Sequence, residues 1–428
     1  MEKSMKNSGI EWIGEIPDNW EIIPNKYLFE NHSVKVGATW DKYKLLSLTT
    51  MGVKEKDSSV AGGKVPDSYE NYQTVVPGDM IFCLFDLDCS AVFSGVSPYY
   101  GMITSAYDVY EINKKLADNL YVDYLFQYAF SNRYYKIYSK NIRYTVTTEM
   151  FKSIRTPIPP LDTQMKIGTL LSNKCSKVDK LIEVQQAQIE KLKEYKQSVI
   201  TEAVTKGLDP FAPMKDSGIE WLGKIQTTFL VEPLKFLLCE PMMYGANEKG
   251  DKTKEYYRYI RITDIESDGG LKESDDNQYL THDVGCYYEL RDGDVLFARS
   301  GGTVGKSFIF NESYGKCAFA GYLIKASCNV DALLPEYLYY YTQSSIYERW
   351  KNSVFIQATI QNIGANKFSM LPIVICSIDE QSKIVYAIKN KCAKIDKLIA
   401  LKQEKIEKLN EYKKSLIYEY VTGKKEVV

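Results

Sequence analysis

Residues 164–205 read QMKIGTLLSNKCSKVDKLIEVQQAQIEKLKEYKQSVITEAVT, and residues 381–422 read QSKIVYAIKNKCAKIDKLIALKQEKIEKLNEYKKSLIYEYVT. Both segments place apolar residues at alternating spacings of four and three, which is the heptad pattern of coiled-coil helices. Each segment predicts a helix of roughly 60 Å at 1.5 Å per residue. Two such helices of equal length in one chain favour an antiparallel pair, although each could instead pack only on its neighbouring domain.

The predicted seam of this coiled coil has a matching set of residues in each copy. Its core positions are Leu171, Cys175, Val178, Ile182, Ile189 and Leu192, and then Ile388, Cys392, Ile395, Ile399, Ile406 and Leu409. Polar residues interrupt the seam at equivalent places, Gln185 with Lys402 and Lys196 with Lys413. A polar group in a seam costs stability and can fix register and partner.

A second repeat lies before each helical segment. Residues 5–16 (MKNSGIEWIGEI) and 214–225 (MKDSGIEWLGKI) share nine of twelve residues at an offset of 209, whereas the helical copies lie 217 apart. The segments between the repeats barely resemble each other. We therefore expect a repeated frame that holds two different modules.

The predicted fold class is α+β: two globular domains joined by two long helices in an antiparallel coiled coil, with an internal pseudo-twofold repeat. Both modules alternate β-branched or aromatic runs with Gly, Asp and Asn turns. Two landmarks relate them: Pro77–Phe82 corresponds to Asp292–Phe297, and Tyr124–Phe126 to Tyr337–Tyr339. The predicted boundaries are 1–156 for the first module, 157–207 for the first helix, 208–372 for the linker and second module, and 373–428 for the second helix.

The bulk composition excludes several classes of protein. The chain has 428 residues, 45% hydrophobic and 25% charged, without an apolar stretch long enough for a membrane span, so we expect a cytoplasmic protein. Nine cysteines include no C-x-x-C pair, and with only two histidines a zinc site is not expected. The net charge of −1 gives no global field for nucleic acid. Locally, however, residues 133–155 mix basic and aromatic side chains, which suits either a nucleic-acid contact or a solvated helix face.

Ser300–Ser307 (SGGTVGKS) nearly fits the phosphate-binding loop G-x-x-x-x-G-K-[ST]. Its first Gly is replaced by Ser300, and no later strand ending in a magnesium-binding Asp is recognisable. A tight turn, or a glycine-rich loop that lets DNA approach the backbone, is favoured over nucleotide binding. We recognise no dinucleotide fingerprint, methyltransferase motif or nucleophile elbow either.

Several phrases together resemble the specificity subunit of type I restriction-modification systems. They are Lys206–Pro210, Met214–Gly223, Ile158–Leu161 before a helix that begins with Gln, Tyr259–Ile265, and Ala298–Lys306. The resemblance covers essentially the whole chain in the order module, helix, module, helix. It implies two target-recognition domains that each read one half of a split double-stranded DNA site. A rod between them suits half-sites about one duplex turn, roughly 34 Å, apart.

The same resemblance implies partners and a division of labour. Two methyltransferase subunits would dock on the helices, and restriction subunits would complete the nuclease. The partners would carry the chemistry with S-adenosylmethionine, ATP and Mg, so the chain would be non-catalytic, with no cofactor, catalytic residue or metal of its own. The alternatives are a coiled-coil adaptor without DNA reading, a P-loop NTPase and a stand-alone methyltransferase.

The predicted DNA-binding residues are side chains that can bridge base edges or phosphates. Most precede a helix start, and three follow the strand-like run that ends at Ala298. They are Lys140, Arg143, Tyr144, Thr147, Arg299, Ser300, Lys306, Gln357, Thr359, Gln361 and Asn362. The first module has Phe85–Asp88 where the second has its glycine-rich loop, so the two are expected to contact DNA through different loops.

Overall fold

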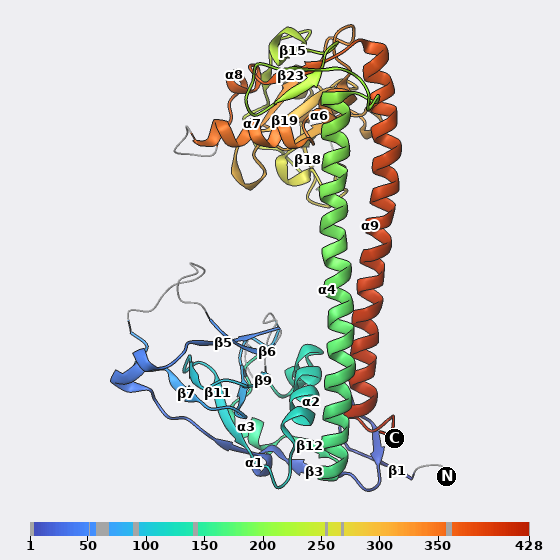
Figure 1. Ribbon diagram of the computed structural model, residues 1–428. Coiled ribbons are helices and arrows are strands. Elements are labelled where there is room, and N and C mark those ends of the chain that lie inside the picture. Colours follow the sequence, from blue (N-terminus) through green and yellow to red (C-terminus); the bar gives the residue numbers. More distant parts are fainter. Residues whose placement is uncertain are drawn as a thin grey trace. The chain divides into compact units, whose positions relative to one another are not determined.

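The computed structural model describes residues 4–50, 52–56, 68–88, 94–139, 144–252, 256–266, 269–356 and 362–427. The chain forms two compact units: Met1–Gln186 with Glu404–Val428, and Ala187–Gln403. Each unit therefore takes one module and parts of both long helices, which Figure 1 labels α4 and α9. The compact units cut across the four consecutive segments expected from the sequence.

The first unit contains the elements that precede α4 and the first part of α4 itself. Its strands are β1 Met5–Asn7, β2 Glu15–Pro17, β3 Glu21–Pro24, β4 Phe29–Asn31, β5 Leu46–Thr49, β6 Gly52–Glu55, β7 Gln73–Val75, β8 Met80–Phe82, β9 Ser94–Val96, β10 Gly101–Ile103, β11 Asp108–Ile112 and β12 Arg155–Ile158. Its helices are α1 Asn25–Leu28, η1 Gly37–Lys42, α2 Asn119–Ser131, η2 Tyr134–Tyr138 and α3 Thr148–Ser153, and α4 runs from Leu161 to Lys206.

The second unit follows a similar order. Its strands are β13 Met214–Asp216, β14 Lys224–Gln226, β15 Leu230–Pro233, β16 Met243–Tyr244, β17 Tyr257–Ile260, β18 Gln278–Leu280, β19 Val295–Ala298, β20 Ser307–Ile309, β21 Cys317–Phe319, β22 Leu323–Ala326 and β23 Pro372–Ile375. Its helices are η3 Leu234–Phe236, η4 Ile262–Asp264, α5 His282–Gly285, η5 Cys286–Tyr288, η6 Gly301–Thr303, η7 Glu312–Tyr314, α6 Pro335–Tyr341, α7 Ser345–Ile356 and α8 Ala365–Phe368, and α9 runs from Ile378 to Val421.

The two long helices have 46 and 44 residues, against about 42 expected from the heptads. Of the predicted seam residues, Leu171, Cys175, Val178, Ile189, Ile388, Cys392, Ile395 and Ile406 are buried, and Ile182, Leu192, Ile399 and Leu409 are half-buried. Within the first unit Lys413 of α9 binds Asp179 of α4 at 2.7 Å, and Lys174 of α4 lies over the Tyr420 ring. The sequence numbers rise along one helix as they fall along the other, so the pairing is antiparallel.

The second unit shows the same pairing with the roles of the helices exchanged. Lys196 of α4 binds Asp396 of α9 at 2.7 Å, and Lys402 donates to Gln188. Asp179 and Asp396 are 217 residues apart, as are Lys196 and Lys413, so one ion pair occurs twice by repetition. Both seam lysines therefore have a carboxylate partner on the opposite helix.

Each module is built on a four-stranded antiparallel sheet of matching topology. The strand order is β4-β11-β8-β9 in the first unit and β16-β22-β19-β20 in the second. The predicted turn precedes the buried strands β8 and β19: Gly78 and Gly293 have φ of 100° and 84°, which favours glycine. The buried carboxylates of Asp79 and Asp294 each accept the N–H three residues earlier at 2.8 Å.

A buried glutamine joins each module to the start of its helix. Gln164 accepts the Asp118 N–H at 2.8 Å and donates to the carbonyl oxygens of Leu116 and Pro159, also at 2.8 Å. Its equivalent Gln381 accepts the Leu334 N–H and donates to the carbonyls of Ala332 and Cys376, each at 2.9 Å. Both side chains are fully buried, so every polar atom that they remove from water is paired.

A buried tyrosine joins each module to the end of the other long helix. The Tyr121 hydroxyl lies 3.1 Å from the carbonyl oxygens of both Pro157 and Val421. In the second unit the Tyr337 hydroxyl lies 3.0 Å from the Val374 oxygen and 3.1 Å from that of Val204. Burial raises the pKa of both hydroxyls well above its usual range, so they remain hydrogen-bond donors at neutral pH.

These contacts correct one predicted correspondence. Tyr337 is equivalent to Tyr121, three residues before the expected partner Tyr124. The aromatic pattern of α2 repeats once per helical turn, so the sequence alone could not distinguish neighbouring turns. The backbone carbonyls that accept from the hydroxyl decide between them.

The SGIEW repeats form short hairpins, β1–β2 and β13–β14, that pack on helix ends. In the first unit Ile10 and Ile13 share a core with Tyr420 and Val421 of α9, and in the second Leu222 packs in the same core as Val204 of α4. Each helix is followed by a glycine with positive φ, Gly207 at 73° and Gly423 at 72°. This is the conformation that commonly ends an α-helix.

Candidate nucleic-acid interface

Four of the predicted DNA-binding residues gather where β19 ends in the second unit. Arg299 and Ser300 follow the strand, and Lys306 immediately precedes β20, the next strand of the same sheet. Asn362 pairs with Ser300 in an antiparallel bridge, and the Ile363 N–H donates to the Arg299 carbonyl at 2.9 Å. We call Arg299, Ser300, Lys306 and Asn362 the strand-end site. Lys306 and Asn362 are exposed, and Arg299 and Ser300 are half-buried.

The glycine-rich loop at this site is not a phosphate-binding loop. It connects β19 to the antiparallel strand β20 through the short η6, with the Gly305 N–H donating to Ala298 O at 2.8 Å. A phosphate-binding loop instead leads into a helix, whose first N–H groups hold the phosphates. Here Lys306–Ser307 begins a strand, so the motif match had the wrong structural context. The P-loop NTPase reading is therefore not supported.

Arg299 is held in place from several sides. Its N–H donates to Tyr322 O at 3.0 Å, and its guanidinium carbon lies 4.8 Å from the centre of the Tyr244 ring. The Tyr244 hydroxyl accepts the Ala365 N–H at 2.9 Å, which fixes the ring from its far end. The Nε atom of Arg299 is buried and has no hydrogen-bond partner among the residues that the structure describes. The aromatic support of this arginine was not recognised in the sequence, because Tyr244 lies 55 residues before it.

Arg261, which lies in the phrase Tyr259–Ile265 quoted for the family resemblance, has a structural role instead. Arg261 donates from Nε and Nη2 to the Asp264 carboxylate at 3.0 and 2.7 Å. This hydrogen bonding raises the pKa of Arg261 above its usual value. The pairing occupies the fork of the guanidinium that would otherwise bind a ligand.

In the first unit the corresponding strand end has different chemistry. Leu84 follows β8 at the position of Arg299, and its carbonyl accepts the Val146 N–H at 2.8 Å, as the Arg299 carbonyl accepts that of Ile363. The leucine side chain is buried and only 3% exposed, whereas the arginine is half-buried. The backbone arrangement is therefore repeated while the side chain at its centre is not.

Strained backbone gathers next to this strand end. Asp86, Arg133 and Tyr144 are non-glycine residues with φ of 52°, 61° and 44°. Arg133 donates to the Leu87 carbonyl at 2.9 Å, and the Leu87 N–H donates to the Tyr144 carbonyl at 3.4 Å, so all three surround one residue. Such conformations are costly and cluster at functional sites.

Of the remaining predicted DNA-binding residues, the structure describes two, both in the first unit. Tyr144 is half-buried, with Lys136 Nζ 3.9 Å above its ring, so a basic and an aromatic side chain do meet here. Thr147 caps α3 by accepting the Met150 N–H at 3.3 Å, which gives it a structural role. The other predicted positions, Lys140, Arg143, Gln357, Thr359 and Gln361, lie outside the described residues.

The ionisable groups near Asp79 and Asp294 also differ between the two units. In the first unit His32 Nδ1 lies 3.0 Å from Asp79. Burial raises the pKa of the Asp79 carboxyl above its usual value, although its hydrogen bonds with the Val76 N–H and with His32 lower it. In the second unit Lys325 lies between Glu240 at 2.9 Å and Asp294 at 4.0 Å. Hydrogen bonding to Lys325 lowers the pKa of Glu240. These side chains are paired with one another within the fold.

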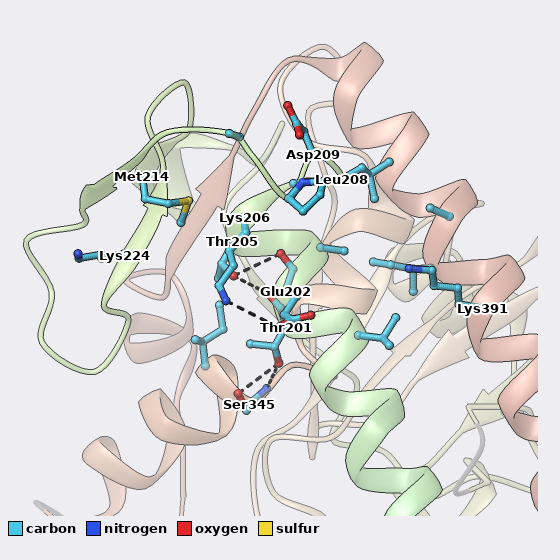
Figure 2. A pocket seen from close by; sticks show the side chains of 18 of the residues that line it. Thr201, Glu202, Thr205, Lys206, Leu208, Asp209, Met214, Lys224, Ser345 and Lys391 are labelled. Atoms are coloured by element: carbon cyan, nitrogen blue, oxygen red, sulfur yellow. Dashed lines mark hydrogen bonds and ion pairs between the residues drawn. The ribbon is translucent and has the colours of Figure 1, made fainter.

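A cavity of about 970 Å³ lies elsewhere in the second unit, at the end of α4 (Figure 2). Thr201, Glu202 and Lys206 line it together with Lys224 of β14 and Lys391 of α9. The Thr201 hydroxyl accepts the Ser345 N–H at 2.8 Å, which ties α4 to the start of α7. The cavity is lined by the frame and by α7, and none of the predicted DNA-binding residues lines it.

Comparison with known proteins relates this chain to one family. Residues 246–411 match the family described as type I restriction modification DNA specificity domain. Two relatives come from Methanocaldococcus jannaschii. The type I restriction enzyme MjaVIII specificity subunit is 23% identical over 83% of this chain and 81% of the relative. The putative type I restriction enzyme MjaX specificity subunit is 22% identical over 96% of this chain and 95% of the relative.

The chain is thus similar to type I restriction-modification specificity subunits over most of its length. A solved chain from work on complex assembly and conformational transition of the type I R-M system has a TM-score of 0.70 at 14% identity, covering 95% of this chain and 98% of that chain. This match shows a shared fold over both units.

Of the helices that the structure describes, none has the length and apolar character that a membrane span requires. Within the same residues, no group of three or more His, Cys, Asp or Glu side chains could hold a metal ion.

Proposed function

We propose that this chain is the DNA-recognition subunit of a type I restriction-modification complex, and that each module reads one half of an asymmetric, interrupted duplex site. The observation that carries the proposal is the contrast at the strand ends. The carbonyl of Leu84 in the first unit and that of Arg299 in the second accept equivalent backbone N–H groups, from Val146 and Ile363. Equivalent scaffolds with unlike side chains are what two readers of different half-sites need.

The proposal includes partners that act on the DNA once it is bound. The repeated hairpins and helix ends present similar surfaces twice, which suits the docking of two methyltransferase subunits, with restriction subunits completing the assembly. Methylation with S-adenosylmethionine, and cleavage with ATP and Mg, would take place in those partners. This chain would bind none of these cofactors and would act in the cytoplasm, where the host DNA is.

Two alternatives make different demands on the molecule. A coiled-coil adaptor without DNA reading would have no use for an arginine positioned by an aromatic ring at a strand end. A stand-alone enzyme would bind ATP or methylate DNA as the purified chain. Measuring both activities with the chain alone separates the enzyme reading from the proposal.

The proposal is tested by methylation-detecting sequencing of the host genome with and without the gene. We expect loss of one asymmetric, interrupted N6-methyladenine motif when the gene is deleted, and its return on complementation. An unchanged methylome in a host that expresses the methyltransferase partner would refute DNA recognition by this chain.

A further inference from the structure

We propose that Arg299 reads the edge of a guanine in the half-site of the second unit, with Tyr244 as the positioning residue that holds its guanidinium plane. This inference rests on the proposed function and assigns one base contact within it. Three observations support it. The backbone and guanidinium of Arg299 are fixed, its guanidinium N–H groups have no acceptor among the described residues, and the equivalent position in the first unit is a leucine.

The backbone of Arg299 is fixed on both sides. Its N–H donates to Tyr322 O at 3.0 Å, and its own carbonyl accepts the Ile363 N–H at 2.9 Å. The preceding residue, Ala298, is paired in the sheet with Leu323. The side chain therefore starts from a point with little freedom, which reduces the entropy lost when it binds a ligand.

Tyr244 supplies the second constraint, acting on the guanidinium itself. The tyrosine backbone pairs with Ile324 in the sheet, and its hydroxyl accepts the Ala365 N–H at 2.9 Å. Both ends of the ring are thus anchored. The guanidinium carbon lies 4.8 Å from the ring centre, within the range of a cation–π contact.

The guanidinium still has hydrogen bonds to make. Among the residues that the structure describes, Arg299 has no ion pair and its Nε has no acceptor. Arg258 and Arg261 of the same unit are instead paired with Glu273 and Asp264. The Arg299 guanidinium therefore has no acceptor among the described residues, and its terminal N–H groups remain for a ligand that offers acceptors.

The surface beside Arg299 is open to such a ligand. A side-chain carbon added at Gly301 or Gly302 would meet no atom of another described residue within 4 Å, apart from its neighbours in the chain. Tyr322 is 64% exposed and Asn362 is also exposed, so neighbouring groups could contact adjacent bases. A base edge can therefore approach the backbone at the strand-end site.

A base edge suits this arginine better than a phosphate. A planar fork held at one angle matches the paired acceptors O6 and N7 of guanine in the major groove. Contacts to the phosphate backbone are independent of sequence, so two modules on one frame could share them. The Arg299 position is not shared, because Leu84 occupies it in the first unit.

The test uses the complete complex with its methyltransferase partner in a host without other adenine methylation. Arg299→Ala should make one G·C pair in one half of the methylated motif degenerate, and lower methylation of the original site roughly 10- to 100-fold. Arg299→Lys should relax the same pair, because lysine keeps the charge and loses the fork. The other half of the motif should not change.

Two further variants distinguish the positioning of Arg299 by Tyr244 from a general effect of losing a positive charge. Tyr244→Leu keeps Arg299 and removes its ring, so it should relax the same base pair to a smaller degree. Arg291→Ala is the matched control, since Arg291 is an exposed arginine just before the other end of β19. It should leave the motif unchanged.

Three outcomes are decisive. If Arg299→Ala lowers methylation with the motif intact and reduces its salt dependence, while Arg299→Lys largely retains both, the contact is to phosphate and the inference is wrong. If both variants methylate the original motif as the unaltered chain does, Arg299 has no role in reading. If the unaltered complex itself methylates no interrupted motif, the proposed function fails. Should Arg299→Ala fail to assemble, Arg299→Lys decides the question.

Discussion

At the scale of single residues, a few buried polar side chains hold the frame to the modules. Gln164 and Gln381 have the same three hydrogen bonds in their two units, reaching segments that lie up to 49 residues earlier in the chain. A polar side chain is buried at low cost only when every donor and acceptor is paired. These glutamines therefore fix the angle at which each helix leaves its module.

We expect Gln381→Leu to destabilise the second unit by about 3 kcal/mol. Leucine fills similar space but leaves the Leu334 N–H and the carbonyls of Ala332 and Cys376 unpaired in the interior. Denaturant unfolding of the purified chain measures the change. Gln403→Leu is the control, because Gln403 is exposed on the same helix and should shift the free energy by about 0.5 kcal/mol or less. Equal effects of the two substitutions would contradict the role assigned to Gln381.

At the scale of elements, the two long helices are paired through one repeated interaction. Asp179–Lys413 and Lys196–Asp396 are each 2.7 Å apart and lie in different units. The sequence predicted Lys196 and Lys413 as polar breaks that could fix register. In a heptad seam the apolar positions tolerate a shift of seven residues, whereas a charge without its partner does not. The ion pairs therefore select one register of α4 against α9.

Charge reversal tests this register selection. Lys196→Asp places two carboxylates opposite each other and should cost about 1 kcal/mol, whereas adding Asp396→Lys should restore most of that loss. Thermal unfolding of the two single variants and the double variant gives the coupling energy, which we expect to fall with added salt. Lys193→Asp is the comparison, since Lys193 pairs with Glu190 along its own helix. A coupling with Asp396 as large for Lys193 as for Lys196 would rule out a specific pair.

At the scale of the whole molecule, the duplication separates a repeated frame from two unlike modules. Repeated residues form hairpins, helix ends and junctions. The side chains at the strand ends, such as Leu84 and Arg299, differ between the two modules. The frame contacts the second module partly through backbone groups, as when Tyr337 approaches the Val204 and Val374 carbonyls. A different module with a tyrosine at this position should therefore fit the same frame.

Exchange of residues 226–372 for the equivalent segment of another specificity subunit should change one half of the methylated motif and leave the other intact. Methylation-detecting sequencing of a host that expresses the chimera with its methyltransferase partner reads both halves at once. Changing the chimera's tyrosine at the position equivalent to Tyr337 to phenylalanine should keep the same new motif with lower stability, because the ring is retained and one hydrogen bond is lost. Changes in both halves would mean that the modules do not read independently.

The sequence predicted the elements whose signal is local. Heptad spacing identified both long helices, and a proline or glycine marked where the first begins and ends. It also predicted the turn before β8 and β19, because glycine with positive φ has few substitutes. The SGIEW repeats marked the frame without revealing that they fold as hairpins.

Other predictions needed distances that no local pattern contains. SGGTVGKS matched a nucleotide-binding motif, yet the chain continues as β20 because Ser307–Ile309 finds a partner in β19. Tyr337 was matched to Tyr124 because aromatic residues recur on each turn of α2. The strand-end site brings Tyr244, Arg299 and Asn362 together from three separate segments.

The sequence by itself determined that this protein is a duplicated frame holding two modules, since periodicity and repetition act between residues close in the chain. Only the tertiary structure decided which arginine is free to bind and which is already paired. Arg261 meets a carboxylate three residues away, whereas Arg299 meets an aromatic ring and an open surface. Identical side chains acquire different roles because strand pairing determines which acceptors surround them.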